Sequence, residues 1–355
     1  MKISVNGSQL SRAIAIDQVG SPAVLIDRPI PEPGDNQLLV RVTAASLNPV
    51  DQKTRDEGLF FKQSPQVLGH EIAGEVTKLG KGVNASRFSV GDHIFAQVNF
   101  SPGQILADGG ALQQYSLVDA RFAAKTNEAG LTDDEASTIP VCAIASFIGL
   151  FHPTGLGLPP PPAAPTPFLA SRELQGNAIL IIGGGSNCGQ YAIQFAKLSG
   201  FPQIITIAST ANESTLKSLG AAHVIDRYIG LEQSVRAVRA IVGDNLVYAF
   251  DAVNTGRMQD LGLATLSNSK KGRLTTLNRI SEAEPDASLV KKKIAGYERG
   301  MTFGFSALYP NLCPSFWRHI AGWVKAVWVR PLPFAVNKIL DGYRRGQGQK
   351  VVLKP

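Results

Sequence analysis

Residues 177–200 of the 355-residue chain read NAILIIGGGSNCGQYAIQFAKLSG. The run from Ala178 to Ile182 is short and apolar, which is typical of a parallel strand that is covered on both faces. Glycines follow at 183–185 and at Gly189. The residues after them place apolar side chains at helical spacing (Ala192, Ile193, Ala196 and Leu198). Strand, glycine turn and helix in this order are typical of the opening of a dinucleotide-binding unit.

The glycine turn departs from the strict G-x-G-x-x-G pattern, because Cys188 stands at the third glycine position. A G-x-x-S-x-x-G pattern fits better. Glycine clusters also occur in ordinary tight turns, and it is the flanking strand and helix that favour phosphate binding. We therefore predict that the turn and the first residues of the helix bind a cofactor pyrophosphate: Gly183, Gly185, Ser186, Asn187, Cys188 and Gly189.

The composition is that of a globular protein with room for two domains, with 44% hydrophobic and 18% charged residues. Three cysteines without paired spacing argue against a disulfide framework and a four-cysteine zinc lobe. The N-terminal residues lack the apolar segment of a signal peptide, and the longest nearly apolar run, Ile139–Phe151, is too short to span a bilayer. We expect a cytoplasmic protein.

The net charge of +7 is spread along the chain rather than concentrated. Its densest cluster, Lys291 to Lys293, is expected to be solvated surface. A positive balance suits an anionic cofactor and does not indicate a nucleic-acid partner.

Residues 11–118 predict a small antiparallel barrel, because short strand patterns recur between glycine-rich turns. The strand candidates are 13–16, 23–26, 37–42, 46–53, 67–83, 88–96 and 109–118. From Thr132, a predicted N-cap, the pattern becomes helical. The proline-rich segment 155–173 is expected to be an exposed insertion.

After the glycine turn, strand and helix patterns alternate, which predicts an α/β fold with a doubly wound parallel sheet. Strands are expected at 203–208, 223–225, 246–253 and 273–277, and helices at 212–219, 231–242 and 258–266. The segment from about Met301 follows neither pattern.

The order of motifs resembles the medium-chain dehydrogenase/reductase superfamily. The resembling pieces are GHEIAGEV (69–76), VGDHIFA (90–96), the glycine turn and SLGAAHVID (218–226). The resemblance implies a GroES-like β-barrel domain over 1–145, a Rossmann domain over 146–295, and a return to the first domain over 296–355. It also implies that the cofactor lies in the cleft between the two domains.

SLNPVDQK (46–53) resembles the zinc-independent quinone and enoyl reductase branch, because zinc-dependent members carry Cys where this chain has Asn48. A catalytic zinc needs about three protein ligands, so we predict no metal and expect His70 to be bonded within its own turn. The insertion, the YAFDAV strand and the TLN turn resemble the fungal trans-acting enoyl reductases of polyketide pathways and ToxD-like proteins. The alternative is a zinc-type alcohol or aldehyde dehydrogenase in which His70 helps to hold zinc.

The end of the second strand predicts NADPH rather than NADH. NAD sites place a carboxylate there to bind the ribose 2′-hydroxyl, whereas this chain has Ser209 and Thr210. Lys217 and Arg227 are the nearest cations for a 2′-phosphate. Family NADPH reductases often have Tyr at the position of Arg227, and Lys217 can equally be a solvated helix residue.

The resemblance implies further contacts with the cofactor. It places Asn48, Asp51 and Lys53 at the nicotinamide, Cys142 and Ser146 on a helix lining the cleft, Asn254 and Asn278 after the fourth and fifth strands, and Phe303 and Gly304 on the next strand. Asparagines are also common turn residues, but ligands bind outside the carboxyl ends of such sheets.

The implied reaction is hydride transfer from NADPH to an activated alkene or a quinone. Lys53 is a candidate for stabilising the enolate oxygen or delivering a proton, and Tyr115 is a second proton-donor candidate that can equally pack in the barrel. The substrate would be a small molecule or a carrier-bound acyl chain, and the protein a monomer or homodimer without nucleic-acid or membrane partners. The alternative from another class is a non-catalytic NADPH-binding protein.

Overall fold

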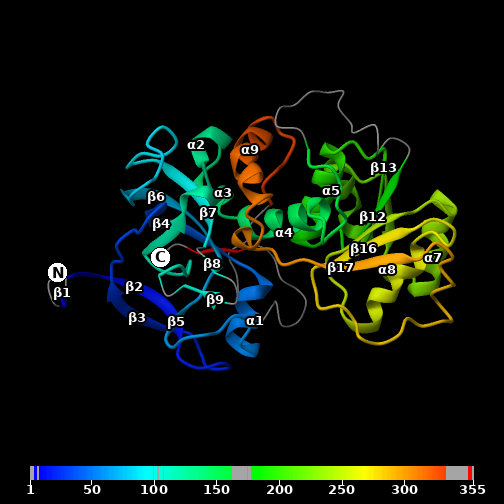
Figure 1. Cartoon of the computed structure of the whole chain (residues 1–355), viewed down its shortest axis with the longest axis horizontal. Coiled ribbons are helices and arrows are strands. Elements are labelled where there is room, and N and C mark those ends of the chain that lie inside the picture. Colours follow the sequence, from blue (N-terminus) through cyan, green and yellow to red (C-terminus); the bar gives the residue numbers. More distant parts are fainter. Residues whose placement is uncertain are drawn as a thin grey trace. The chain divides into compact units, whose positions relative to one another are not determined.

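The computed structural model describes residues 4–5, 8–98, 100–101, 104–106, 108–161, 174, 177–332 and 351–353. The chain divides into two compact units (Figure 1). The first comprises Met1–Val141 and Phe305–Pro355, and the second Cys142–Gly304. The boundaries expected from the sequence lay at 145 and 295.

The first unit is built on antiparallel sheets. One has the order β10-β4-β6-β7-β11, formed by Tyr115–Asp119, Gln37–Leu47, Glu71–Leu79, His93–Gln97 and Ala123–Lys125, with β18 (Val351–Leu353) also paired to β4. Another joins β1 (Ser4–Val5), β2 (Ser8–Ile16), β3 (Val24–Pro29) and β5 (Gln66–Val67). A short hairpin consists of β8 (Phe100–Ser101) and β9 (Gln104–Ile105). Side chains such as Ile16, Val40, Ile72 and Phe88 form one core under these strands.

The strand predicted over 46–53 is wrong beyond Leu47, because α1 occupies Pro49–Glu57. The local chemistry favours a helix there. Proline at the first helical position needs no donor, and the Asp51 carboxylate accepts the N–H of Asn48 at 2.6 Å, as the third residue of a capping box does. Gly58 ends the helix with a left-handed φ of 73°.

The helices of the first unit are short apart from α1 and α9. The N-cap predicted at Thr132 is confirmed, since its hydroxyl accepts the N–H of Glu135 at the start of α3 (Asp133–Ala136). Helix α2 covers Thr126–Ala129, and α9 covers Cys313–Lys325, a segment for which no element was predicted. Trp317 of α9 is buried and donates its indole N–H to Ser306 at 2.9 Å.

Helix α4 (Pro140–Phe151) is a core helix. Together with α3 it forms the stretch Asp133–Phe151, which is the one place in the described chain long and apolar enough to cross a membrane. Its most apolar window is 89% buried in the protein. Burial of this kind is typical of a helix that packs inside a globular fold, so the stretch is weak evidence for a membrane span.

The second unit contains the predicted parallel sheet, with strand order β14-β13-β12-β15-β16-β17. In that order the strands are His223–Asp226, Gln203–Ala208, Ala178–Ile182, Tyr248–Asp251, Gly272–Thr276 and Tyr297–Met301. Helices α5 (Asn187–Leu198), α6 (Glu213–Leu219), α7 (Leu231–Val242) and α8 (Asp260–Thr265) alternate with them. Figure 1 shows these elements in green to orange. The order reverses between β12 and β15, which is the switch point where such sheets bind ligands.

The described beginning of the proline-rich segment is not the exposed insertion that we predicted. Leu156 and Leu158 are buried, and their N–H groups donate to carbonyls of α4 at 2.9 and 3.0 Å. Arg273 of β16 donates to the Leu156 carbonyl at 3.0 Å. The segment therefore starts by packing onto the second unit, while residues 162–173 of the predicted insertion lie outside the described residues.

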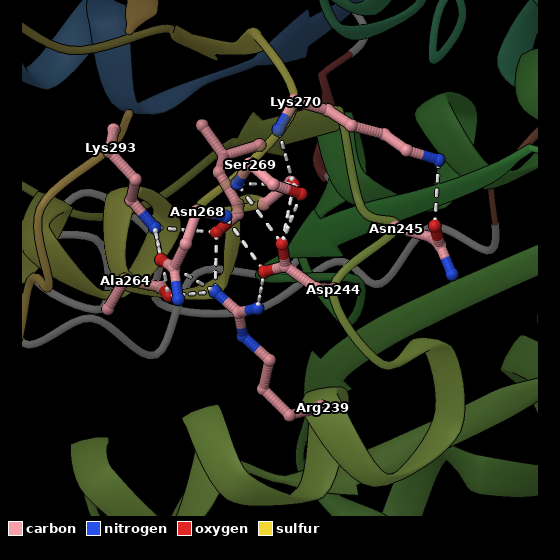
Figure 2. A network of polar contacts seen from close by, with 10 residues as sticks. Arg239, Asp244, Asn245, Ala264, Asn268, Ser269, Lys270 and Lys293 are labelled. Carbon is pink, nitrogen blue, oxygen red and sulfur yellow. Dashed lines mark hydrogen bonds and ion pairs between the residues drawn. The ribbon is translucent and has the colours of Figure 1, made fainter. Parts of the chain in front are cut away.

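A polar network ties together the amino ends of β15 and β16, on the edge away from the glycine turn (Figure 2). The Asp244 carboxylate accepts the N–H groups of Asn268 and Ser269 at 2.8 and 3.1 Å and pairs with Arg239. Arg239 and Lys293 both donate to the Leu266 carbonyl, just beyond the end of α8. Lys293 is therefore part of this network, whereas its neighbours Lys291 and Lys292 are exposed as predicted.

Removing the Asp244 carboxylate should destabilise the second unit. We expect Asp244→Ala to lower the free energy of unfolding by about 1–3 kcal/mol, because two backbone N–H groups and Arg239 lose their acceptor. Denaturant unfolding measures the change. Glu284→Ala, which alters an exposed carboxylate, is the control and should unfold like the wild type. If the wild type, Asp244→Ala and Glu284→Ala were equally stable, the network would not stabilise the second unit.

The pH dependence of the free energy of unfolding should reveal the lowered pKa of Lys293. Burial, together with the charge of Arg239, lowers its pKa from 10.5 to about 8. Between these values the unfolded chain holds a proton that the folded protein has lost, so this group makes stability rise from about pH 8 towards pH 10.5. Lys293→Met should flatten that part of the curve when unfolding is measured across this range. An unchanged curve would contradict the lowered pKa.

Candidate active site at the glycine turn and the carboxyl edge of the parallel sheet

The glycine turn follows β12 at the switch point and is locked by Ser186. Gly183 has a left-handed φ of 82°. Ser186 is the N-cap of α5: its hydroxyl accepts the N–H of Gly189 at 3.0 Å and donates to the Gly183 carbonyl at 2.7 Å. The G-x-x-S-x-x-G pattern thus describes a turn in which the serine joins both glycines. The N-terminus of α5 is presented at this turn, as in sites that bind phosphate.

The glycines are required by close packing as well as by φ. A Cβ on Gly184 would lie 1.9 Å from the Thr206 hydroxyl, and one on Gly189 would lie 2.1 Å from the Gly183 carbonyl oxygen. Gly189 therefore takes the close-approach role that the strict motif gives to its third glycine. Cys188 is tolerated one position earlier, where its carbonyl accepts the Ser146 hydroxyl at 2.7 Å.

Cys142 and Ser146 lie on α4, as predicted, and both side chains are buried. The Ser146 hydroxyl also contacts the Cys142 carbonyl at 2.9 Å. Its described bonds connect α4 to the start of α5, so Ser146 supports the turn. Direct contact of either residue with a cofactor stays a prediction.

The end of β13 lies beside Arg227. Ser209 caps a short 3-10 turn over Thr210–Asn212, and no carboxylate stands before Glu213. The Arg227 N–H donates to the Ala208 carbonyl at 3.0 Å, which places Arg227 next to Ser209. Its guanidinium lies 4.6 Å from the ring centre of Tyr228, an exposed residue that sequence reasoning missed.

Lys217, the second cation considered for a 2′-phosphate, forms an ion pair with Glu213 one helical turn away, at 2.7 Å. Both side chains are about half exposed. Pairs of this kind are common on helix surfaces and contribute little to stability. The backbone of Arg227 is bonded beside Ser209, whereas Lys217 lies on α6; contact of either cation with a 2′-phosphate stays a prediction.

Asn254 and Asn278 follow β15 and β16, as predicted, and the fold brings them together. The Asn278 side-chain amide donates to the Asn254 carbonyl at 3.3 Å. Asp251, the last residue of β15, is buried, and its carboxylate accepts the N–H groups of Val253 and Asn254 at 3.1 and 2.9 Å. Burial raises the pKa of Asp251. The sequence offered one signal for it, an acidic residue closing an apolar strand.

Phe303 and Gly304 are not on a strand, contrary to the prediction, because β17 ends at Met301. Phe303 is 42% exposed, whereas Gly304 packs so closely on Ala145 that a Cβ would lie 2.7 Å from it. Several exposed large apolar side chains follow the carboxyl ends of the strands: Tyr228, Val253, Met258 and Phe303. Side chains of this kind suit the rings of a dinucleotide.

In the first unit, a buried cluster joins α1 to the start of β6. His70 is hydrogen-bonded through Nδ1 to the Asp51 carboxylate, not within its own turn as predicted. The Asn48 amide donates to one oxygen of Glu71 at 2.6 Å, and the N–H of Val141 donates to the other at 2.7 Å. All four side chains of the cluster are almost fully buried: Asn48, Asp51, His70 and Glu71.

This cluster does not fit a zinc ion. Within the described ranges no three His, Cys, Asp or Glu side chains are grouped so that they could hold a metal. Both Glu71 oxygens and both Asp51 oxygens already accept hydrogen bonds. His70 Nε2 has no hydrogen-bond partner among these residues, but one imidazole nitrogen falls short of about three ligands.

The two predicted proton donors lie elsewhere in the first unit. Lys53 is half-buried on α1, two residues after Asp51, and side chains two apart on a helix do not face each other. Tyr115 is half-buried at the start of β10, opposite Arg41 of β4. The catalytic roles of Lys53 and Tyr115, and the nicotinamide contacts of Asn48 and Asp51, stay predictions.

Comparison with known proteins identifies the class. Residues 34–128 match the alcohol dehydrogenase GroES-like domain, and residues 188–301 match the domain described as zinc-binding dehydrogenase. The uncharacterized protein YNL134C of Saccharomyces cerevisiae is 30% identical over 73% of this chain and 69% of its own length. The chain belongs to the medium-chain dehydrogenase/reductase superfamily, and the predicted fold class, a GroES-like domain with a Rossmann-type parallel sheet, is confirmed.

Other proteins resemble this chain over part of its sequence or in its fold. Dehydrogenase azaJ of Aspergillus niger is 36% identical over 57% of this chain, and the matching region spans only 56% of that relative. The CurK enoyl reductase has a TM-score of 0.73 at 20% identity, covering 97% of this chain and 99% of its own. A mycobacterial protein solved in complex with NADPH has a TM-score of 0.70 at 21% identity, covering 97% and 100%. At these identities the structural likeness establishes the fold.

Proposed function

We propose that the protein is an NADPH-dependent, zinc-independent oxidoreductase that transfers hydride to an activated alkene (an enoyl or enone group) or to a quinone. The observation that carries the proposal is the carboxyl edge of the parallel sheet. There the serine-locked glycine turn lies at the switch point, and the neighbouring strand ends in Ser209 with Arg227 beside it. The fold shared with CurK enoyl reductase supports the reaction class.

Each group at this edge has a proposed task. The turn from Gly183 to Gly189 and the N-terminus of α5 hold the pyrophosphate through backbone N–H groups. Ser209, Thr210 and Arg227 hold the 2′-phosphate, because hydroxyls and a guanidinium can donate to it. Asn254 and Asn278 lie at the part of the site that holds the nicotinamide end of NADPH. NADPH, when bound, supplies the hydride, while the protein orients the acceptor and excludes water.

Proton delivery is proposed for the first unit. Hydride addition to the β-carbon of an enone or enoyl group places negative charge on the carbonyl oxygen. A cationic or proton-donating side chain near that oxygen lowers the barrier. Lys53 is our first candidate for this task and Tyr115 the second.

Zinc independence is part of the proposal. A metal analysis distinguishes it from the alternative, a zinc-type alcohol or aldehyde dehydrogenase. In the buried cluster, Asn48 and both oxygens of Glu71 are already hydrogen-bonded, which supports a site without zinc. Metal analysis of protein purified without added zinc should find far less than one zinc per chain. Stoichiometric zinc, together with alcohol oxidation that is lost on chelation, would favour the alternative.

The setting of the reaction is also part of the proposal. We infer that the protein acts in the cytoplasm on a small molecule or a carrier-bound acyl chain, as a monomer or homodimer and without nucleic-acid or membrane partners. We propose a place in fungal secondary metabolism on the resemblance to fungal trans-acting enoyl reductases, and the match to a dehydrogenase of Aspergillus niger supports a fungal setting. A non-catalytic NADPH-binding protein is the second candidate, favoured if the protein binds NADPH but reduces no acceptor.

Replacing Lys53 should separate chemistry from cofactor binding. We expect Lys53→Ala to lower kcat by about 10²-fold or more, the usual contribution of a positioned acid, with the Kd of NADPH unchanged. Steady-state kinetics and fluorescence titration measure the two effects. Lys62→Ala, which removes an exposed lysine of the same unit, is the control. An unchanged kcat would remove Lys53 from the mechanism.

A further inference from the structure

Gln259 lies at the centre of the carboxyl-edge loops, although its sequence context does not mark it out. It ends a short 3-10 turn (Gly256–Gln259) before α8, and its side chain is fully buried. Its amide nitrogen lies 2.9 Å from the Arg279 carbonyl and 3.3 Å from both the Asn254 carbonyl and the Thr276 hydroxyl. Its amide oxygen accepts the N–H of Ser281 at 3.0 Å.

These bonds connect two segments that are distant in sequence. The first loop, 252–259, contains Asn254, and the second, 277–281, contains Asn278. The two loops also meet directly, because the Asn278 amide donates to the Asn254 carbonyl at 3.3 Å. Gln259 contributes two bonds to the second loop, one to the Arg279 carbonyl and one from the Ser281 N–H, so its buried amide has partners for both its donor and its acceptor.

The first loop is also fixed against the glycine turn. The Asp251 carboxylate accepts the N–H groups of Val253 and Asn254. The Val253 side chain fills the space beside Gly183, where an added Cβ would lie 2.6 Å from its methyl group. A shift of the first loop would thus disturb the pyrophosphate turn, and a shift of the second would move Asn278.

We propose that Gln259 is a positioning residue for the nicotinamide end of NADPH. It holds the Asn254 and Asn278 loops at a fixed separation, so the cofactor meets a preformed edge and does not have to order two loops on binding. Preformed sites gain affinity because this ordering cost is avoided. The inference rests on the proposed function, and no atom of Gln259 is required to touch the cofactor.

The test uses two substitutions and a matched control. Gln259→Met keeps an unbranched side chain of similar length but loses every hydrogen bond. Gln259→Glu keeps the acceptor for the Ser281 N–H. It replaces the amide nitrogen, a donor, with a carboxylate oxygen that can only accept, and this oxygen would face the oxygens of Asn254, Thr276 and Arg279. Gln66→Met is the control: Gln66 is equally buried, lies on β5 of the first unit, and accepts one N–H, from Lys62.

Hydrogen exchange of the cofactor-free protein and NADPH titration give two readouts. We expect both Gln259 variants to exchange the amides of residues 277–281 at least about tenfold faster and to bind NADPH about tenfold more weakly, while Gln66→Met matches the wild type. Circular dichroism at the titration temperature verifies that each variant is folded. If Gln259→Met does not fold, Gln259→Glu decides on the same readouts.

Three results would contradict the proposal, and each rules out a different part of it. NADPH affinity at the wild-type level in a folded Gln259 variant would overturn the positioning role, whether or not its stability falls. If the wild type itself does not bind NADPH, the proposed function fails and the cofactor role of Gln259 fails with it. Unchanged exchange over 277–281 would show that Gln259 does not hold the loops.

Discussion

Ser209→Asp should reverse the cofactor preference from NADPH towards NADH. The new carboxylate would stand at the end of β13, where it repels a 2′-phosphate and accepts a hydrogen bond from a ribose 2′-hydroxyl. We expect the ratio of kcat/KM for NADPH to that for NADH to fall by about 100-fold, which corresponds to about 2.7 kcal/mol. Steady-state rates with both cofactors at one acceptor concentration measure it.

The control for this experiment is Ser209→Ala. It removes the hydroxyl that accepts the N–H of Ala211 at 3.4 Å without adding charge. It should therefore weaken NADPH modestly, through the loss of one donor to the 2′-phosphate, and leave NADPH the preferred cofactor because Thr210 and Arg227 remain. An NADPH/NADH ratio that is the same in Ser209→Asp and the wild type would show that the end of β13 does not face the 2′-position.

Gly189→Ala should abolish tight cofactor binding. The added methyl would lie 2.1 Å from the Gly183 carbonyl oxygen and 2.7 Å from the Gly184 Cα, both backbone atoms that cannot rotate away. The turn must then move, and its N–H donors move with it. We expect the Kd of NADPH to rise by about 100-fold or more and the free energy of unfolding to fall by about 1–3 kcal/mol.

Two further glycines calibrate this result. A Cβ on Gly185 would meet only the end of the Asn212 side chain, at 2.9 Å, so Gly185→Ala should be milder. Gly322 lies inside α9 with open space around it, and Gly322→Ala should be neutral or slightly stabilising. Fluorescence titration and denaturant unfolding should show the largest loss of NADPH affinity and of stability for Gly189→Ala. The loss should be smaller for Gly185→Ala and absent for Gly322→Ala. Equal NADPH affinity in Gly185→Ala and Gly189→Ala would contradict the described turn.

The second unit was largely predictable because its signals are local. Apolar runs such as 203–208 and periodic segments such as 231–242 form the elements that their patterns predict. In the first unit, the extended reading of 46–53 failed because it ignored Asn48, Pro49 and Asp51 as a helix start. Helix α9 was missed, although its amphipathic pattern carries Trp317 and Trp323 into the core.

The contacts that define the candidate site were less predictable, because they join residues far apart in sequence. His70 bonds to Asp51, 19 positions away, and Gln259 bonds to Ser281, 22 positions away. No local pattern specifies such pairs, since they depend on which strands become neighbours. Motif reasoning placed Asn254 and Asn278 correctly after their strands, but it did not find the amide that joins their loops.

Hydride transfer from NADPH to an activated alkene or quinone, without a metal, is the activity proposed for the chain. The most direct test follows the absorbance of NADPH with chelator-treated protein and a panel of enones, quinones and enoyl thioesters. We predict acceptor-dependent NADPH consumption that chelation does not diminish, and much slower consumption of NADH. A folded protein that binds NADPH but is inert with the whole panel, or active only after zinc is added, would contradict the claim.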